Sequence, residues 1–171
     1  MTRTGMVCSA CGKPSSFSYE DVRCACGGTK LVRYDLEAVA RTFNRQSLAG
    51  RGASMWRYRE LLPVASADSI VTLGEGWTPL SRIEARSAVP GIRQLWMKRE
   101  ELNPTGSFKA RGLSAAVSLL KERGVRRAAI GSNGNAAAAL AAYAGAAGIE
   151  AYVFVPEDCP PLIIKIGRAH V

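Results

Sequence analysis

The stretch Asn103-Pro104-Thr105-Gly106-Ser107-Phe108-Lys109-Ala110-Arg111-Gly112 decides how the rest of the chain is interpreted. It lies between an acidic pair, Glu100 and Glu101, and a segment with helical periodicity. Four apolar residues of that segment recur on one face of a helix: Leu113, Ala116, Val117 and Leu120. Gly124 suits the position just after the helix. The stretch therefore predicts an ordered loop that leads directly into a helix.

Strands and helices alternate around this helix. Residues 93–98 and 128–130 have the pattern of strands, and an alanine-rich helix is expected over residues 136–147, ended by Gly148. Residues 151–155 are the next expected strand, and their continuous apolar character predicts burial on both faces. This order is typical of an α/β fold with a parallel sheet and flanking helices. We expect residues 93–165 to form that domain.

A second polar stretch, Gly131-Ser132-Asn133-Gly134-Asn135, joins a strand to the alanine-rich helix. It lacks the third glycine of a dinucleotide-binding fingerprint, and no Gly-Lys-Ser/Thr follows that would make it a P-loop. Its amide groups and the helix N-terminus suit an anion such as a carboxylate. Ligands of parallel sheets bind beyond the carboxyl ends of the strands, where both polar stretches fall. We therefore expect the two stretches to face one crevice.

Lys109 is the residue of these stretches with the clearest chemical role. Most lysines are exposed, solvated charges. Lys109 instead falls in the first turn of the expected helix, where the helix dipole disfavours a cation. A lysine whose amine is easily deprotonated is a nucleophile for Schiff-base formation. The sequence thus predicts that Lys109 carries the chemistry of the crevice.

Four of the five cysteines lie near the N-terminus in two close pairs: Cys8, Cys11, Cys24 and Cys26. In a chain without an evident secretion signal this pattern favours metal ligation, with free thiols or a disulfide as the alternatives. Four thiolates satisfy tetrahedral Zn²⁺ and leave no open position, so the metal would be structural. With short strands expected over residues 15–22 and 29–34, residues 1–34 are predicted to form a zinc-ribbon-like module. The fifth cysteine, Cys159, is expected to be an ordinary thiol.

Residues 35–92 are expected to form a connecting segment with helices. Asp35 suits the N-cap of a helix over residues 36–43, and residues 46–55 are expected to be a loop. Gly74-Glu75-Gly76-Trp77-Thr78-Pro79-Leu80 predicts an ordered turn that continues in an extended conformation. Two tryptophans of the segment are expected in the core: Trp56 and Trp77.

Composition narrows the class of protein. With 171 residues and 47% hydrophobic residues, the chain is long enough and apolar enough for a folded domain and a small module. We expect no membrane association, because no apolar run is long enough to span a bilayer, and no signal peptide, which favours the cytoplasm. The net charge of +9 is scattered, so it predicts ordinary surface charge and no nucleic-acid partner.

The stretch around Lys109 resembles the lysine motif of the fold-type II pyridoxal-phosphate enzymes. Ser132-Asn133-Gly134-Asn135-Ala136 is similar to the Ser-x-Gly-Asn loop of that family. Together with the cysteine-rich module, residues 56–63 and the Gly-Glu-Gly-Trp-Thr-Pro-Leu turn, it makes the chain similar to the threonine synthases. The resemblance covers residues 8 to about 165. It implies a tryptophan synthase β-like fold.

The resemblance also implies roles for individual residues. Lys109 would bind pyridoxal phosphate as a Schiff base and shuttle protons, and Asn135 would hydrogen-bond the 3′ hydroxyl of the cofactor. The substrate carboxylate would be held by Ser132, Asn133 and Gly134. Ser107, on the cofactor side, and Thr78, on the substrate side, would help near the phosphates.

The implied reaction converts O-phospho-L-homoserine and water to L-threonine and phosphate, as a carbon–oxygen lyase acting on phosphate. The implied parent enzyme is a homodimer. The alternatives are another fold-type II enzyme, such as a threonine dehydratase or a cysteate synthase, and a zinc-ribbon nucleic-acid-binding protein. The last would use the cysteines and the charge but leaves the Lys109 and Asn135 motifs unexplained.

The chain is shorter than the family it resembles. No match is present for the glycine-rich loop that binds the cofactor phosphate, or for the partner of the pyridine nitrogen. We therefore expect an N-terminal fragment that is inactive alone. Residues 166–171 depart from the family and are expected to be a non-native tail, so that His170, the one histidine, receives no role.

Overall fold

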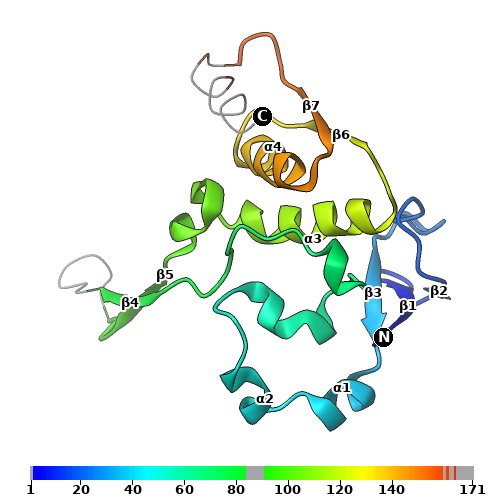
Figure 1. Ribbon diagram of the computed structural model, residues 1–171, viewed down its shortest axis with the longest axis vertical. Coiled ribbons are helices and arrows are strands. Elements are labelled where there is room, and N and C mark those ends of the chain that lie inside the picture. Colours follow the sequence, from blue (N-terminus) through cyan, green and yellow to red (C-terminus); the bar gives the residue numbers. More distant parts are fainter. Residues whose placement is uncertain (1, 84–90, 160, 162–163, 165–171) are drawn as a thin grey trace. The chain divides into compact units, whose positions relative to one another are not determined.

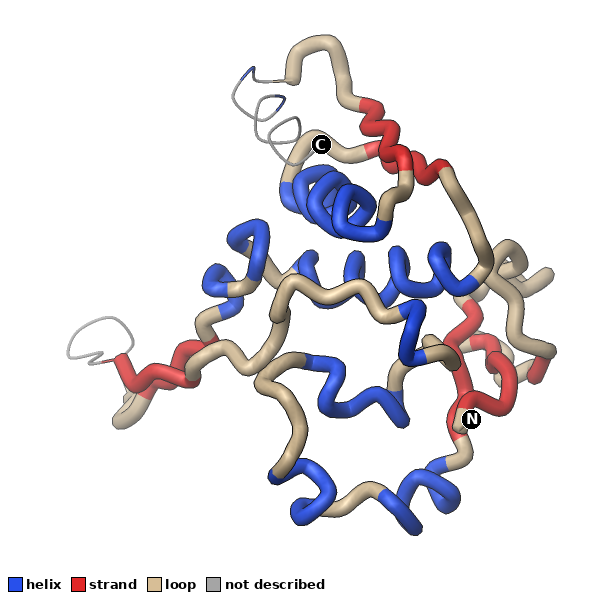
Figure 2. Tube along the Cα trace, viewed as in Figure 1, coloured by secondary structure: helices blue, strands red, loops and turns tan. Residues whose placement is uncertain are grey.

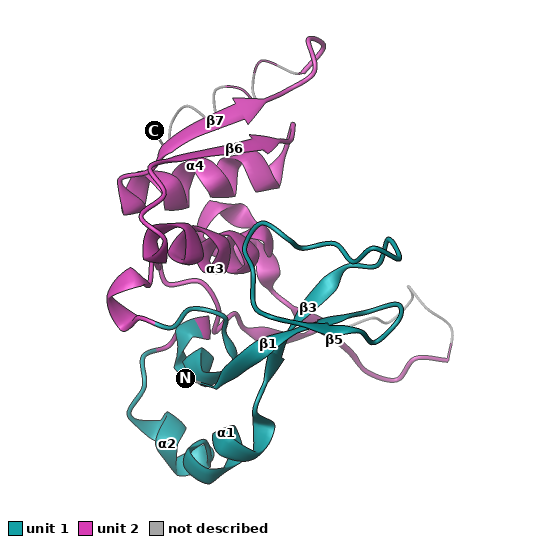
Figure 3. Ribbon diagram, turned by 90° about the vertical axis from the view of Figure 1, so that its right-hand side faces the viewer, with its two compact units in different colours: residues 1–52, 56–65 teal, residues 53–55, 66–171 magenta. Residues whose placement is uncertain are grey.

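The computed structural model describes residues 2–83, 91–159, 161 and 164. The expected tail at residues 166–171, with His170, lies outside the described residues. The chain divides into two compact units, which we describe separately: residues 1–52 with 56–65, and residues 53–55 with 66–171 (Figure 3). The division expected from the sequence has other bounds and stays a prediction.

The first unit contains a three-stranded antiparallel sheet in the order β2-β1-β3. The strands are β1 (Arg3–Cys8), β2 (Pro14–Ser15) and β3 (Lys30–Tyr34). β3 agrees with expectation, whereas β1 was not predicted. The strand expected over residues 15–22 is wrong beyond Ser15. The Ser18 hydroxyl accepts hydrogen bonds from the backbone N–H groups of Glu20 and Asp21 at 3.2 and 2.9 Å, which bends the chain out of the sheet.

Two short helices follow β3. α1 (Leu36–Thr42) begins as expected, because Asp35 Oδ1 accepts from the Ala38 N–H at 2.8 Å. α2 (Arg45–Ala49) occupies part of the segment predicted to be a loop. Its start is a reciprocal cap in which Asn44 accepts from the Ser47 N–H at 2.9 Å, and the Ser47 hydroxyl accepts from the Asn44 N–H at 3.1 Å. The prediction failed because serine is an uncommon partner in such a box.

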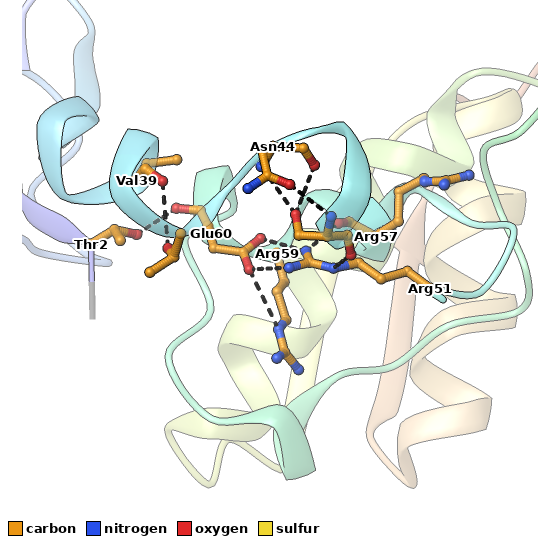
Figure 4. Close-up of polar contacts among 9 residues, drawn as sticks. Thr2, Val39, Asn44, Arg51, Arg57, Arg59 and Glu60 are labelled. Carbon is orange, nitrogen blue, oxygen red and sulfur yellow. Dashed lines mark hydrogen bonds and ion pairs between the residues drawn. The ribbon is translucent and has the colours of Figure 1, made fainter. Parts of the chain in front are cut away.

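A half-buried ion pair between Arg51 and Glu60 joins the end of α2 to the following 3₁₀ helix η1 (Met55–Leu61). The Arg51 guanidinium donates to both Glu60 carboxylate oxygens at 2.7 Å, and its Nε donates to the Ser47 carbonyl at 3.0 Å (Figure 4). Arg51 holds the pKa of Glu60 below its usual value. Trp56 is buried in η1, as predicted.

In the second unit two helices and a parallel strand pair form successive layers. The elements are α3 (Lys109–Glu122), β6 (Arg127–Gly131), α4 (Asn135–Ala147) and β7 (Glu150–Phe154). β6 pairs with β7 in parallel, as predicted, and α4 lies between this pair and α3 (Figures 1 and 3). α4 ends at Gly148, whose φ of 68° is left-handed.

The core of the second unit lies between α3 and α4. Eight buried residues form it: Val71, Ala110, Val117, Ala139, Leu140, Tyr143, Ala144 and Ile149. Alanines on α4 allow close approach of the helices, and on α3 the positions facing them include Ser114 and Ser118, which are fully buried. Leu113 and Leu120 pack against this core as expected, but Ala116 is exposed.

Two predictions for the sheet are wrong. β5 (Leu95–Lys98) pairs with β4 (Leu80–Ile83) in an antiparallel pair, apart from β6 and β7, instead of joining a continuous parallel sheet (Figure 2). Within the described residues α4 packs against one face of β7, and Tyr152 and Phe154, which alternate with the residues of that face, are 44% and 66% exposed. No helix in the described part of the chain has the length and apolar character needed to cross a membrane.

Candidate active site

Lys109 is the first residue of α3 and follows a tight turn, the 3₁₀ helix η4 (Pro104–Gly106). The turn places Thr105 at φ 67° and Gly106 at φ 69°. Ser107 is buried, and its hydroxyl accepts from the Lys109 backbone N–H at 3.3 Å. The Lys109 amine lies 4.7 Å from the centre of the Phe108 ring. Among the described residues no carboxylate pairs with this amine, which leaves it available to a ligand.

An ion pair braces the start of α3. Arg111 donates to both oxygens of Glu100 at 2.7 Å, and Glu100, in the 3₁₀ helix η3 (Glu100–Leu102), also accepts from the Thr78 hydroxyl at 2.7 Å and from Asn103 Nδ2 at 2.9 Å. Arg111, ahead of the two weaker donors, lowers the pKa of Glu100 to about 2. The acidic pair before the lysine motif was the sequence signal for this brace, although its role was not predicted.

Glu75 is a completely buried carboxylate that the sequence reasoning missed. It accepts from the Ser114 hydroxyl on α3 and the Tyr143 hydroxyl on α4, both at 2.6 Å, and from the Leu73 N–H at 3.0 Å. Burial works to raise the pKa of Glu75, but these hydrogen bonds outweigh burial and lower it. Burial and the adjacent carboxylate raise the pKa of Tyr143. Glu75 thus ties its turn to the two helices that begin at Lys109 and Asn135.

The second polar stretch starts α4. Gly134 is the N-cap, and its N–H donates to the Ser132 hydroxyl at 3.3 Å, while the Ser132 N–H donates to the Phe154 carbonyl at 3.0 Å. The side chains of Asn133 and Asn135 are exposed. α4 packs against η4, so the two polar stretches belong to elements in contact. The single crevice expected between them stays a prediction.

Thr78 is buried in the turn formed by residues 74–80, and its hydroxyl donates to the Glu100 carboxylate. The Arg111 guanidinium donates to the Thr78 hydroxyl at 3.3 Å. This hydroxyl therefore stabilises the turn in the structure, and its expected contact with substrate stays a prediction. Trp77, expected in the core, is instead 61% exposed because the left-handed backbone at φ 54° directs it outward.

The four N-terminal cysteines converge in the first unit. The sulfur atoms of Cys8, Cys11, Cys24 and Cys26 all lie within 4.8 Å of one another. The Cys8–Cys26 and Cys11–Cys24 sulfurs are 3.5 and 3.7 Å apart, close to the ~3.8 Å that tetrahedral Zn–S bonds of about 2.3 Å require. A Cβ atom at Gly28 would lie 2.6 Å from the Cys8 sulfur, so only glycine fits there. The N–H groups of Cys11 and Ala10 donate to the Cys8 sulfur and lower its thiol pKa to about 6, whereas hydrogen bonds with the other cysteine sulfurs outweigh the Gly28 N–H and raise the pKa of Cys26 to about 11.

Comparison with known proteins decides the family. The family model described as "Pyridoxal-phosphate dependent enzyme" matches residues 71–170, more than half of the chain. The chain belongs to the pyridoxal-phosphate dependent enzymes. The expected cofactor class is thereby confirmed, and the match includes both polar stretches of the candidate site.

Three similar proteins from different organisms all carry the name threonine synthase. The threonine synthase of Methanocaldococcus jannaschii is 39% identical over 150 residues, which cover 88% of this chain and 37% of that protein. The threonine synthase of Methanosarcina acetivorans is 37% identical, with coverage of 87% and 36%. That of Halalkalibacterium halodurans is 45% identical over 109 residues, with coverage of 61% and 30%. The matched part of the chain thus covers between 30% and 37% of the length of these relatives.

The donor groups around Lys109 fit pyridoxal phosphate. The cofactor is an aldehyde with a phosphate, and the site offers a primary amine that has no carboxylate partner among the described residues. The Asn135 side chain is exposed at the N-terminus of α4, where backbone N–H groups and the helix dipole favour an anion. Lys109 thus offers an amine that suits the aldehyde, and Asn135 offers an exposed amide that can hydrogen-bond a polar group of the cofactor.

Proposed function

We propose that the chain provides the lysine-bearing part of a threonine synthase, which converts O-phospho-L-homoserine and water to L-threonine and phosphate. The supporting observations are that the relatives named above are threonine synthases and that the family match over residues 71–170 includes Lys109. Within this proposal the fold is of type II, tryptophan synthase β-like, and the enzyme is a carbon–oxygen lyase that works as a homodimer.

Lys109 has two tasks in the proposed mechanism. Its amine would hold the cofactor through the aldehyde, and the same amine would accept and return protons at the substrate carbons. Pyridoxal phosphate, when bound, supplies an electron sink for carbanions. The Glu100–Arg111 brace and the Ser107 hydroxyl keep the first turn of α3 in place, so the amine is positioned by the rigid helix start.

The residues at the start of α4 bind and orient. Asn135 would hydrogen-bond the 3′ hydroxyl of the cofactor. Ser132, Asn133 and Gly134 hold the substrate carboxylate with hydroxyl, amide and backbone donors, aided by the positive end of the helix dipole. Ser107 and Thr78 would help near the phosphates. Glu75 joins both helices to one turn and so keeps these donors at a fixed distance from Lys109.

We also propose that the four cysteines bind a structural Zn²⁺. The spacing of the four sulfur atoms supports this. With all four ligands from the protein, the metal has no open position and takes no part in the reaction. It stabilises a sheet of three short strands that has few apolar residues of its own.

The test is a steady-state assay of phosphate release from O-phospho-L-homoserine, using the enzyme that contains this chain. The proposal predicts release of phosphate together with formation of L-threonine, and loss of both in Lys109→Ala. Lys121→Ala, at the other end of α3, is the matched control and should keep full activity. Ammonia release from L-threonine without phosphate release from O-phospho-L-homoserine would contradict the proposal and favour a dehydratase.

A further inference from the structure

Trp77 has an unusual backbone conformation. Its φ is 54°, and within residues 2–83 and 91–159 the other left-handed residue that is not glycine is Thr105, at φ 67°. Bulky and β-branched residues rarely adopt this region, because the Cβ atom clashes with the backbone. Such strain persists only where the surroundings enforce it, and it concentrates at functional sites. Both strained residues lie in the segments that surround Lys109.

The neighbours of Trp77 hold it in this conformation. Glu75 is pinned by Ser114 and Tyr143, and the Gly76 N–H donates to Asn103 Oδ1 at 2.9 Å. A Cβ atom at Gly76 would lie 2.5 Å from the Met55 nitrogen, so the backbone there is closely packed. Residues on both sides of Trp77 are therefore fixed, while the indole between them is 61% exposed.

The same contacts place Trp77 at the candidate active site. Asn103, whose side-chain oxygen accepts from the Gly76 N–H, precedes Lys109 by six residues. Arg111, whose guanidinium donates to the Thr78 hydroxyl, follows Lys109 by two residues. Thr105 between them has a buried hydroxyl without a hydrogen-bond partner in the described part of the chain. An exposed aromatic side chain thus stands in a turn that is hydrogen-bonded, on both sides of Trp77, to the segment that carries Lys109.

We propose that Trp77 contacts the substrate and sets its specificity. An indole offers a flat apolar face against which the carbon chain of an amino-acid substrate can pack. This inference rests on the proposed function. It explains why a strained backbone is retained at a position where glycine would relieve the strain.

Trp77→Gly tests the inference, because ligand contact and packing predict opposite changes in stability. Glycine relieves the left-handed strain, so the urea midpoint of unfolding should rise, while binding of O-phospho-L-homoserine should weaken by roughly tenfold or more. Trp96→Gly is the matched control, since Trp96 is 52% exposed on β5. It should lower the midpoint and leave binding unchanged. Binding is measured by calorimetry on the enzyme that contains this chain, loaded with pyridoxal phosphate, and KM should rise more than kcat falls.

Three other outcomes would contradict the proposed role of Trp77 or the proposed function. Equal binding by wild type and Trp77→Gly would overturn the role of Trp77 alone. A lowered midpoint in Trp77→Gly would assign the residue to packing and overturn it too. Failure of the wild-type enzyme to bind O-phospho-L-homoserine would overturn the proposed function, and this inference with it.

Discussion

Replacing Glu100 by glutamine tests the brace that holds the start of α3. The carboxylate pairs with Arg111 through two hydrogen bonds of 2.7 Å, and its pKa falls from 4.5 to about 2. That difference corresponds to about 3 kcal/mol at most. Because the Glu100 side chain is 28% exposed, solvent screening reduces the expected loss in Glu100→Gln to about 2 kcal/mol. Equilibrium urea unfolding followed by circular dichroism measures the loss directly.

The pH dependence gives this prediction a second readout. The folded-state pKa of Glu100 lies below the unfolded value, so its stabilisation is fully present above pH 4.5 and disappears as the pH falls towards 2. The difference between wild type and Glu100→Gln should therefore shrink below pH 4.5. Glu101→Gln is the control, because Glu101 pairs with Arg99 on the exposed surface and should leave the midpoint unchanged. Equal effects of the two substitutions, or a difference that persists at low pH, would refute the reasoning.

Three further predictions concern other parts of the chain. Tyr143→Phe removes a hydrogen-bond donor to the buried Glu75 and should lower the free energy of unfolding by about 1–3 kcal/mol in urea titrations. Tyr152→Phe is the control, because the Tyr152 hydroxyl donates to Glu150 on the exposed surface and its loss should change the free energy of unfolding little. Asp35→Ala should destabilise by about 1 kcal/mol through loss of the α1 cap, and Asp35→Asn should keep most of that stability. Purified protein should contain one equivalent of zinc by elemental analysis, lost in Cys11→Ser but kept in Cys159→Ser; full zinc content in Cys11→Ser would contradict the four-cysteine site.

Local patterns with one dominant cause were predictable from the sequence. The periodicity after Lys109 gave α3, and Gly124 and Gly148 marked helix ends because both adopt left-handed φ values of 69° and 68°. Asp35 capped α1 as its type and position indicate. The cysteine spacing predicted the sulfur cluster, since two tight turns can each present two thiols to one point.

Features that depend on distant partners were not predictable. Whether β5 pairs with β4 or with β6 is decided by long-range packing, and its own pattern is the same in either case. Burial of Glu75 depends on Ser114 and Tyr143, which follow it by 39 and 68 positions. Exposure of Trp77 depends on a backbone angle that its flanking residues enforce, so a preference of tryptophan for the core misplaced it.

The most direct test of the account is covalent trapping at Lys109. The enzyme that contains this chain is incubated with pyridoxal phosphate, reduced with borohydride and digested, and the modified peptide is identified by mass spectrometry. The account predicts a reduced cofactor adduct on Lys109, absent from Lys109→Arg and retained in Lys98→Arg. An adduct on another lysine with Lys109 unmodified would contradict it.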